Sequence, residues 1–329
     1  MTRGAARLAP AGEEAIEKGA RLLREGGLVA FPTETVYGLG ADAASAAAVA
    51  KIYAAKGRPS FNPLIAHVAD VDAARREAEL PAAALRLAEA FWPGPLTLVA
   101  PRAAGGSVCE AARAGLASVA LRVPSAPVAR ALILAAGRPI AAPSANRSGH
   151  VSPVTARHVL EDLGERVDLV IDGGRADKGV ESTIVSVLGE RPRLLRPGAL
   201  TREALEEILR APLEAGEGGA GEGGAAAIVA PGMTASHYAP RARLRLEADE
   251  LRQGEAGLDF GGCFGAREGR GPILDLSPAA DLEEAAANLF LYLRELDARG
   301  AALVAVAPIP ARGLGEAIND RLRRAAAPK

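Results

Sequence analysis

The chain has 329 residues and a formal net charge of −1, with 39 basic and 40 acidic side chains. This balance argues against a protein that binds nucleic acid through its overall charge, although it allows a local basic pocket. Apolar residues make up 49% of the chain and aromatic residues only 3%, so we expect a core filled with alanine, leucine and valine. The length exceeds the usual size of one hydrophobic core and therefore predicts two domains.

The two cysteines, Cys109 and Cys263, lie far apart, and neither belongs to a Cys-x-x-Cys motif. A disulfide framework or a zinc site is therefore not expected. The N-terminal residues lack the apolar centre of a signal peptide, and no run approaches the ~18 apolar residues of a membrane span. These features predict a soluble, cytoplasmic protein.

Helices and strands are predicted to alternate through the first two thirds of the sequence. Helical periodicity predicts helices at residues 13–25, 45–56, 71–79, 82–91, 125–136, 155–163 and 201–210. Short apolar runs predict strands at residues 28–31, 63–68, 96–100, 119–123, 140–142 and 169–171, and a hairpin at 182–187 and 193–196. Ser125 is expected to cap the helix at 125–136, and Thr201 and Ala204 half-match a capping box. This alternation is typical of an α/β fold.

The composition changes after residue 210. Residues 211–227 read APLEAGEGGAGEGGAAA, which predicts a flexible linker because such a segment buries too little apolar surface to fold. The linker ends in APGMTASHYAP, whose Met, His and Tyr are unusual for a linker. Two strands, a helix at 282–299, a strand at 302–307 and a helix at 314–324 follow. We therefore predict a first domain at residues 1–210, a linker at 211–240 and a small second α/β domain at 241–329.

Polar residues follow the first predicted strand in the segment FPTETVYGLGADA, residues 31–43. This segment packs Thr33, Glu34, Thr35 and Tyr37 closely against glycines. Buried hydroxyls and carboxylates need partners, and ligands of α/β proteins usually bind at strand ends. The segment is therefore a candidate binding site, and the alternative is an ordinary polar turn between a strand and a helix.

Two cations stand in the segment KGRPSFNPL, where a helix gives way to a strand. Lys56 and Arg58 at such a junction suit a polyphosphate, and Asn62 adds a neutral amide. His67 lies on the strand that follows, and its nearness to Arg58 favours a role as a ligand-binding residue. The alternative is a solvated loop with two surface charges.

Arg122 is flanked by apolar residues in the segment SVALRVPSAP. An arginine inside an apolar strand must find an anion, which is either a structural aspartate or a substrate carboxylate. The residues themselves leave both interpretations open.

Small polar side chains gather in two further segments. APSANRSGHVSP carries Ser144, Asn146, Ser148 and Ser152, which either hold phosphate or ribose oxygens or form an ordinary turn. In GVESTIVSV and LLRPG, Ser182 and Thr183 lie on one strand and Arg196 on its expected partner, and the alternative is an edge hairpin. The sequence lacks the phosphate loop G-x-x-x-x-G-K-[ST], the dinucleotide fingerprint and the G-x-S-x-G elbow. It therefore offers cations and hydroxyls rather than a covalent nucleophile.

Taken together and in this order, seven motifs resemble the YrdC-type domain: PTETVYGLG, KGRPSFNPL, WPGPLTLV, SVALRVP, APSANRSG, ESTIV and LRPG. The match covers about residues 10–200, and HYAP at residues 237–240 and the small second domain fit the same pattern. The whole chain thus resembles the long, two-domain form of the threonylcarbamoyl-AMP synthase family. The resemblance implies a YrdC-like twisted mixed sheet flanked by helices, with a second, smaller Rossmann-like α/β domain.

Members of this family make threonylcarbamoyl-AMP from L-threonine, bicarbonate and ATP and release pyrophosphate. The resemblance implies the same nucleotidyltransferase activity here, with Mg²⁺ bound through ATP rather than by a dedicated protein site. It also implies that the product passes to a tRNA threonylcarbamoyl transferase complex, for threonylcarbamoyladenosine synthesis in tRNA, and that the protein binds neither membranes nor, stably, DNA.

The resemblance also implies roles for individual residues. Lys56 and Arg58 would be catalytic. The residues implied to bind ATP are Arg58, Asn62, Ser118, Ser144, Asn146, Ser152, Arg196, His237 and Tyr238. The residues implied to bind threonine are Thr35, His67, Arg122, Ala142 and Ser182. The HYAP segment would act as a lid, although Thr234-Ala235-Ser236 stands where the family has a basic, aromatic stretch.

Two other functions are compatible with some of these features. An RNA-binding module that escorts tRNA without turnover would need a basic concave surface and stacking aromatic residues, and the net charge and the 3% of aromatic residues weigh against it. An enzyme that handles carbamoyl phosphate would carry zinc-finger and acylphosphatase segments, which this sequence lacks.

Overall fold

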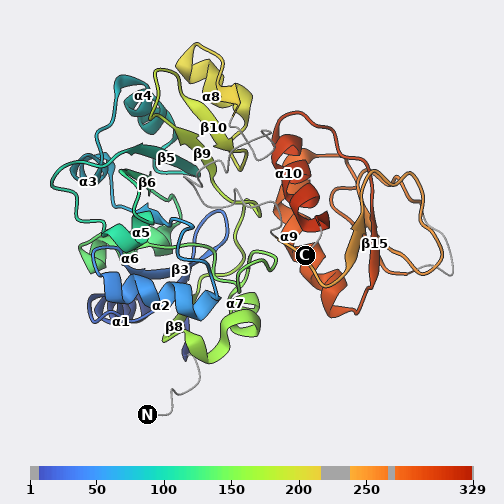
Figure 1. Ribbon diagram of the computed structural model, residues 1–329. Coiled ribbons are helices and arrows are strands. Elements are labelled where there is room, and N and C mark those ends of the chain that lie inside the picture. Colours follow the sequence, from blue (N-terminus) through green and yellow to red (C-terminus); the bar gives the residue numbers. More distant parts are fainter. Residues whose placement is uncertain (1–6, 216–237, 266–270, 328–329) are drawn as a thin grey trace.

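The computed structural model describes residues 7–215, 238–265 and 271–327, which form two sheets that helices cover (Figure 1). We call the part built around the larger sheet the first domain and the part built around the smaller sheet the second domain. The fold class predicted from the sequence is confirmed, because a mixed sheet flanked by helices is followed by a smaller parallel sheet. None of the described helices has the length and apolar character needed to cross a membrane.

The sheet of the first domain has eleven strands. In spatial order they are β1 (Arg7–Pro10), β8 (Leu169–Asp172), β2 (Val29–Pro32), β3 (Tyr37–Asp42), β7 (Ile140–Ala141), β4 (Ile65–His67), β6 (Ser118–Arg122), β5 (Leu96–Pro101), β9 (Thr183–Ser186), β10 (Arg193–Arg196) and β11 (Glu214–Ala215). The sheet is mixed, because β4 and β6 are parallel whereas β5 and β6 are antiparallel. The parallel pairing of β4 and β6 places His67 opposite Arg122 at the carboxyl ends of both strands.

Helices cover both faces of this sheet. On one face, α1 (Glu13–Arg24) and α6 (Pro127–Ala136) pack on β2 and β8 through a core of alanine, leucine and isoleucine. The helices that share the other core are α2 (Ala46–Lys56), α3 (Val71–Glu77), α4 (Ala82–Phe91), α5 (Glu110–Arg113), α7 (Ala156–Leu163) and α8 (Arg202–Leu209). A 3-10 turn, η1 (Gly164–Arg166), follows α7. The low content of aromatic residues is thus matched by cores of small aliphatic side chains.

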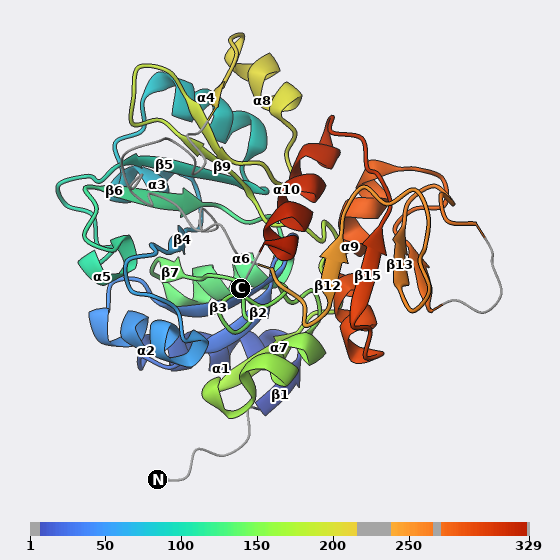
Figure 2. The same cartoon turned by 45° about the vertical axis from the view of Figure 1, so that its right-hand side comes forward.

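The second domain has a four-stranded parallel sheet. Its strands, in spatial order, are β12 (Arg243–Arg245), β15 (Leu303–Val306), β13 (Ala256–Asp259) and β14 (Ile273–Asp275). Two helices, α9 (Leu282–Ala298) and α10 (Leu314–Ala326), lie between this sheet and the first domain in Figure 1, and α10 keeps this place in the turned view (Figure 2). Both helices contact the first domain, since Arg294 of α9 pairs with Asp162 and Glu316 of α10 pairs with Arg202. The two domains therefore meet through helices rather than through a sheet edge.

Several predicted elements differ from the observed ones for local reasons. The sequence analysis missed β3, because Gly38 and Gly40 made the segment resemble a turn, and it also missed β1. The predicted capping role of Ser125 is wrong, since α6 begins at Pro127 and Ser125 donates its backbone N–H to Glu34 instead. The prediction that Thr201 caps a helix is confirmed, because its hydroxyl accepts a hydrogen bond from the amide of the third residue beyond it.

The region of the predicted linker is described only at its ends. Residues 214–215, predicted as part of the linker, form β11 and pair with β10. Residues 216–237, which include Thr234-Ala235-Ser236 and His237, lie outside the described residues. Tyr238, just beyond them, has a positive φ of 61° and is 1% exposed. The predicted boundaries of the two domains stay predictions.

Candidate active site

A pocket lies in the first domain where segments far apart in the sequence converge. It is lined by Thr33, Thr35, Val36, Gly38, Arg58, Ile65, His67, Arg122, Ala142, Pro143, Ser144, Glu181, Ser182, Arg196 and Tyr238. The carboxyl ends of β4 and β6 contribute two of these residues, and the turn between β2 and β3 contributes several more. The pocket thus sits at strand ends, where α/β proteins usually bind ligands.

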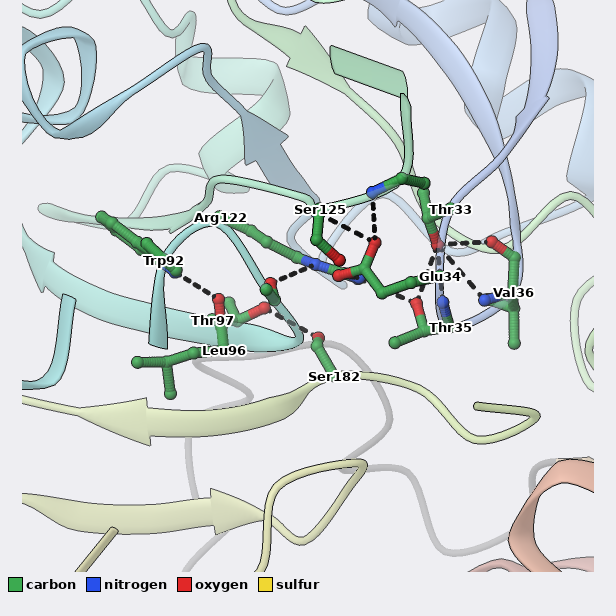
Figure 3. A network of polar contacts seen from close by, with 12 residues as sticks. Thr33, Glu34, Thr35, Val36, Trp92, Leu96, Thr97, Arg122, Ser125 and Ser182 are labelled. Atoms are coloured by element: carbon green, nitrogen blue, oxygen red, sulfur yellow. Dashed lines mark hydrogen bonds and ion pairs between the residues drawn. The ribbon is translucent and has the colours of Figure 1, made fainter. Parts of the chain in front are cut away.

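Arg122 is held at the end of β6 by a buried ion pair. Its Nη2 lies 2.7 Å from Glu34 Oε1, and its Nη1 donates to Thr35 Oγ1 at 3.0 Å (Figure 3). The other oxygen of Glu34 accepts hydrogen bonds from the amides of Ser125 and Ala126, at the N-terminus of α6. Burial alone would raise the pKa of Glu34, but the charge of Arg122 holds it below its ordinary value. The anion paired with Arg122 is therefore a structural carboxylate, and it is a glutamate rather than an aspartate.

His67 lies beside Arg122 and is 2% exposed. Burial, and then the positive charge of Arg122, lower the pKa of His67 to about 3. Its imidazole is therefore neutral near pH 7. Its Nδ1 is buried and has no hydrogen-bond partner among the described residues, which leaves that nitrogen for a ligand.

Lys56 does not line the pocket but holds a loop that forms part of its wall. It ends α2 and is 3% exposed, and its Nζ donates to the carbonyl oxygens of Ser144 and Asn146, each at 2.5 Å. Burial, and then the charge of Arg58, lower the pKa of Lys56 well below its ordinary value. Because Ser144 lines the pocket and Lys56 does not, this ammonium is placed to position the loop at residues 142–146.

Arg58 brings a second buried guanidinium to the pocket. It is 8% exposed, and it donates to the carbonyl oxygens of Asn62 and Pro63 at 3.2 and 3.0 Å. Burial lowers its pKa to about 10, so Arg58 stays charged near neutral pH. Within the described part of the chain no carboxylate forms an ion pair with Arg58, and its charge is available to an anionic ligand.

Two of the described side-chain amides have buried oxygens without a partner. Asn62 Oδ1 and Asn146 Oδ1 make no hydrogen bond to any described residue. Buried polar atoms in native proteins are normally paired, so unpaired ones call for an explanation such as a missing ligand. Neither amide lines the pocket, whereas His67 does, so among these three residues it is His67 whose unpaired nitrogen is offered to a ligand there.

Ser182 and Arg196 form the side of the pocket nearest to β9 and β10. Arg196 is 4% exposed and donates from Nη2 to the carbonyl oxygen of Ser182 at 2.8 Å and to its hydroxyl at 3.2 Å. Thr97 of β5 lies 2.8 Å from the same hydroxyl (Figure 3). The predicted hairpin is confirmed, because β9 and β10 pair in antiparallel fashion and bring Arg196 to Ser182.

Glu181 joins the pocket to the second domain. One of its oxygens accepts a hydrogen bond from Ser152 Oγ at 2.5 Å, and the other lies 2.7 Å from Nε of Arg321. Burial alone would raise the pKa of Glu181, but Arg321 and then Arg196 lower it to about 2. Arg321 also lies over the ring of Tyr238, 5.1 Å from its centroid, and that ring stacks on Phe290 of α9.

The structure brings most of the predicted site residues together. Those that line the pocket are Thr35, Arg58, His67, Arg122, Ala142, Ser144, Ser182, Arg196 and Tyr238. Those described but not lining it are Lys56, Asn62, Ser118, Asn146 and Ser152. Ser118 begins β6, at the opposite end of that strand from Arg122, whereas Ser152 reaches the pocket through Glu181. The roles of these residues stay predictions, and His237 lies outside the described residues.

Sequence reasoning missed the functional position of two buried carboxylates. Glu34 stands in the motif PTET and Glu181 in ESTIV, so both motifs had been recognised without a role for the acid. Their partners lie 88 and 140 residues further along the chain. A buried arginine without a nearby acid in the sequence was the available signal for the first pair.

Comparison with known proteins gives two family matches. Residues 21–198 match the family model described as "Telomere recombination", and residues 200–327 match the model described as "Threonylcarbamoyl-AMP synthase, C-terminal domain". Together the two models account for nearly the whole chain.

Two named relatives and one solved structure match nearly the whole length of this chain. A Bacillus subtilis protein named threonylcarbamoyl-AMP synthase is 41% identical over 327 residues, which cover 94% of this chain and 92% of that protein. A Schizosaccharomyces pombe protein of the same name is 36% identical over 368 residues, covering 95% of this chain and 88% of that protein. The crystal structure of P. abyssi Sua5 complexed with L-threonine matches with a TM-score of 0.87 and 38% identity, covering 97% of this chain and 96% of that one.

Proposed function

Because this chain belongs to the threonylcarbamoyl-AMP synthase family, and is thus a nucleotidyltransferase-type enzyme, we propose that it condenses L-threonine, bicarbonate and ATP to threonylcarbamoyl-AMP and pyrophosphate. The observation that carries the proposal is the convergence of three buried guanidinium groups, from Arg58, Arg122 and Arg196, on one pocket. Such a pocket favours anions, and this reaction must bring two anions together.

Threonine is proposed to bind at Arg122. A guanidinium has five N–H donors, and hydrogen bonds to Gly94, Thr35 and Glu34 use three of them within the described residues. Two donors therefore remain for the carboxylate of the amino acid. Thr35, Ser182 and the neutral His67 surround this position and would contact its amine and hydroxyl. The P. abyssi protein crystallised with L-threonine supports this choice of substrate.

The chemistry that follows needs charge stabilisation more than a nucleophilic side chain. The neutral amine of threonine attacks bicarbonate and gives a carbamate and water. A carbamate oxygen then attacks the α-phosphorus of ATP, and the bond from that phosphorus to the β-phosphate oxygen breaks to release pyrophosphate. Two unit charges 4 Å apart repel by about 1 kcal/mol in water and several times more in a dry site. Arg58 and Arg196 are placed to offset this repulsion.

We propose that Mg²⁺ enters the site bound to the triphosphate of ATP. Among the described residues that line the pocket, the charged side chains are mainly cations, and the one carboxylate, that of Glu181, is paired with Ser152 and Arg321. The phosphates and water would therefore supply most of the metal's ligands, which is common for Mg²⁺. When bound, the ion would neutralise charge on the leaving pyrophosphate. We also propose that the product passes to a tRNA threonylcarbamoyl transferase complex.

The test is an omission experiment on the purified protein. Pyrophosphate release and the threonylcarbamoyl-AMP mass are measured with ATP and Mg²⁺, leaving out threonine, bicarbonate or both in turn. We expect the product only when all the substrates are present, and serine serves as the control for the amino acid. Pyrophosphate release at the same rate with and without threonine would contradict the proposal. Tight, salt-sensitive tRNA binding without turnover would instead favour the escort function.

A further inference from the structure

Arg321 of α10 is a fully buried cation that reaches from the second domain to the wall of the pocket. Its side chain is 0% exposed, and its Nε lies 2.7 Å from Glu181 Oε2. Its Nη1 pairs with Asp320 at 2.5 Å, and its Nη2 donates to the carbonyl oxygen of Pro197 at 3.0 Å. The guanidinium also lies over the ring of Tyr238. Burying an arginine so completely is costly unless each contact is satisfied, so its place is closely specified.

Glu181 stands between this arginine and the pocket. It lines the pocket and is 6% exposed. Its other oxygen accepts a hydrogen bond from the hydroxyl of Ser152. A carboxylate in this position is unfavourable for a pocket that must admit a triphosphate, because like charges repel strongly in a poorly hydrated site. Arg196, which also lines the pocket, is close enough to influence the ionisation of Glu181. Without another cation, Glu181 would compete with a phosphate for Arg196.

We propose that Arg321 is a positioning residue through which the second domain sets the affinity of the first domain for ATP. By pairing with Glu181, Arg321 neutralises a carboxylate on the pocket wall and holds it toward Ser152, so that Glu181 competes less with a phosphate for Arg196. The inference rests on the proposed function, because it takes ATP as the ligand of this pocket.

The pairing of Arg321 with Glu181 also fixes the orientation of the Ser152 hydroxyl. Because the hydroxyl of Ser152 donates a hydrogen bond to Glu181, the orientation of that hydroxyl is fixed. Ser152 is fully buried and does not line the pocket, so it would act on the nucleotide through Glu181 and not by direct contact. If Glu181 were released from Arg321, this hydroxyl would lose its fixed orientation.

A purely structural ion pair makes a different prediction from a positioning one. A structural pair would lower the stability of the protein when it is broken and leave the KM values of the folded enzyme unchanged. A positioning pair would raise the KM for ATP much more than the KM for threonine, because Glu181 adjoins Ser152 and Arg196 whereas Arg122 has its own partner, Glu34.

The experiment compares Arg321→Met, Arg321→Lys and Glu181→Gln, alone and in the double variant Arg321→Met/Glu181→Gln, in the full-length enzyme. Steady-state pyrophosphate release gives the KM for ATP and for threonine. The matched control is Glu316→Gln, on the same helix, which breaks an ion pair between the two domains that does not reach the pocket. Thermal unfolding is measured for every protein.

We expect Arg321→Met to raise the KM for ATP by about tenfold or more, as the loss of one partner of a buried charge pair usually does. The KM for threonine should change far less, and the double variant should recover a large part of the loss because the unpaired carboxylate is gone. Glu316→Gln should leave both KM values within about twofold of the unsubstituted enzyme.

Equal KM values for ATP in Arg321→Met and the unsubstituted enzyme would overturn the inference, and so would an equal rise in Glu316→Gln. If Arg321→Met does not fold, Arg321→Lys provides the test. The ammonium of a lysine cannot contact Glu181, Asp320 and Pro197 at the same time, as the guanidinium does. A KM for ATP within about twofold in that variant would refute the positioning role. An unsubstituted enzyme without threonine-dependent turnover would instead refute the proposed function.

Discussion

Two of the buried arginines that line the pocket differ in the partners that the fold gives them. Arg122 is paired with Glu34, whereas Arg58 donates to backbone carbonyl oxygens. A guanidinium that is already paired is held rigidly and can add a bidentate contact to a carboxylate, which suits an amino-acid substrate. A guanidinium that meets only neutral acceptors keeps its full charge for a phosphate. The difference in partners therefore agrees with the assignment of threonine to Arg122 and ATP to Arg58.

Identifying these partners from the sequence was possible only in part. The apolar neighbours of Arg122 showed that it needs an anion, and the polar cluster around Glu34 showed that a carboxylate lies at a strand end. The link between them depends on the register that places the turn after β2 against the end of β6. Periodicity gives the identity of an element but not its spatial neighbour, so the pair could be recognised only in the structure.

The buried imidazole of His67 makes a testable contribution to acid sensitivity. Its pKa is about 3 in the folded protein and about 6.5 in the unfolded chain, so only the unfolded chain takes up a proton between these values. The free energy of unfolding is therefore unaffected by this group above pH 6.5 and falls as the pH drops from 6.5 toward 3. Between pH 7 and pH 5 the loss amounts to roughly 2 kcal/mol.

His67→Gln should remove this loss. Urea unfolding at pH 7 and pH 5 measures the free energy of unfolding of the unsubstituted protein and of the variant, and the difference between the two pH values should shrink by roughly 2 kcal/mol in the variant. The exposed His150 provides the control substitution, His150→Gln. The same pH dependence in His67→Gln and in the unsubstituted protein would show that His67 does not titrate as its burial implies.

At the scale of elements, α2 and the loop at residues 142–146 act as one unit. Gly57 ends the helix with a φ of +61°, and Lys56 just before it donates to two carbonyl oxygens of the loop. The loop is also tied to β3, since Ala145 donates its amide to the carbonyl oxygen of Tyr37. The sequence identified both segments as polar clusters, but their contact depends on a lysine that points into the protein. Sequence reasoning expected that lysine to face the ligand, because two cations at a junction between a helix and a strand suit a polyphosphate.

We expect Lys56→Met to loosen this loop while α2 stays folded. The variant loses two buried hydrogen bonds, and the gain from no longer burying a polar amino group offsets part of the loss. Hydrogen exchange of the Ala145 amide should become about tenfold faster or more, which corresponds to roughly 1.4 kcal/mol of local stability. Turnover should fall as well, because Ser144 lines the pocket.

Lys51→Met is the control for this change. Lys51 lies on the same helix and also donates to a backbone carbonyl oxygen, that of Gly26. It is exposed, however, and this hydrogen bond does not involve the loop. Exchange at Ala145 should be unchanged in this control. An unchanged rate in Lys56→Met would mean that the loop is held by its backbone hydrogen bonds alone.

At the scale of the whole molecule, the second domain completes the core around the pocket. Val36, Val151, Val154 and Val180 of the first domain share one apolar cluster with Leu289 and Phe290 of α9. Val36 also lines the pocket. Composition and a change of pattern sufficed to predict two domains, yet nothing in the periodicity indicated that helices of the second would pack beside the pocket. That packing depends on contacts between residues more than a hundred positions apart, such as Arg294 with Asp162.

A glycine at the contact between the domains allows a test of this arrangement without truncation. Gly179 has a φ of +65°, and a Cβ added there would lie 2.4 Å from the carbonyl oxygens of Ala286 and Ala287 in α9. Gly174, in the same loop, has a φ of +85° and open space around it. Alanine at either position bears a similar backbone strain of about 1–2 kcal/mol, but only Gly179→Ala must also push α9 away.

We therefore expect Gly179→Ala to destabilise the protein clearly more than Gly174→Ala and to raise the KM for ATP, because displaced helices would draw Arg321 away from Glu181. Thermal unfolding and the KM for ATP, measured on both variants and on the unsubstituted enzyme, give the comparison. Gly174→Ala should lose stability without a change in KM. If the two variants behaved alike, the close approach of the loop to α9 would have no part in nucleotide binding, and the pocket would have to be regarded as complete within the first domain.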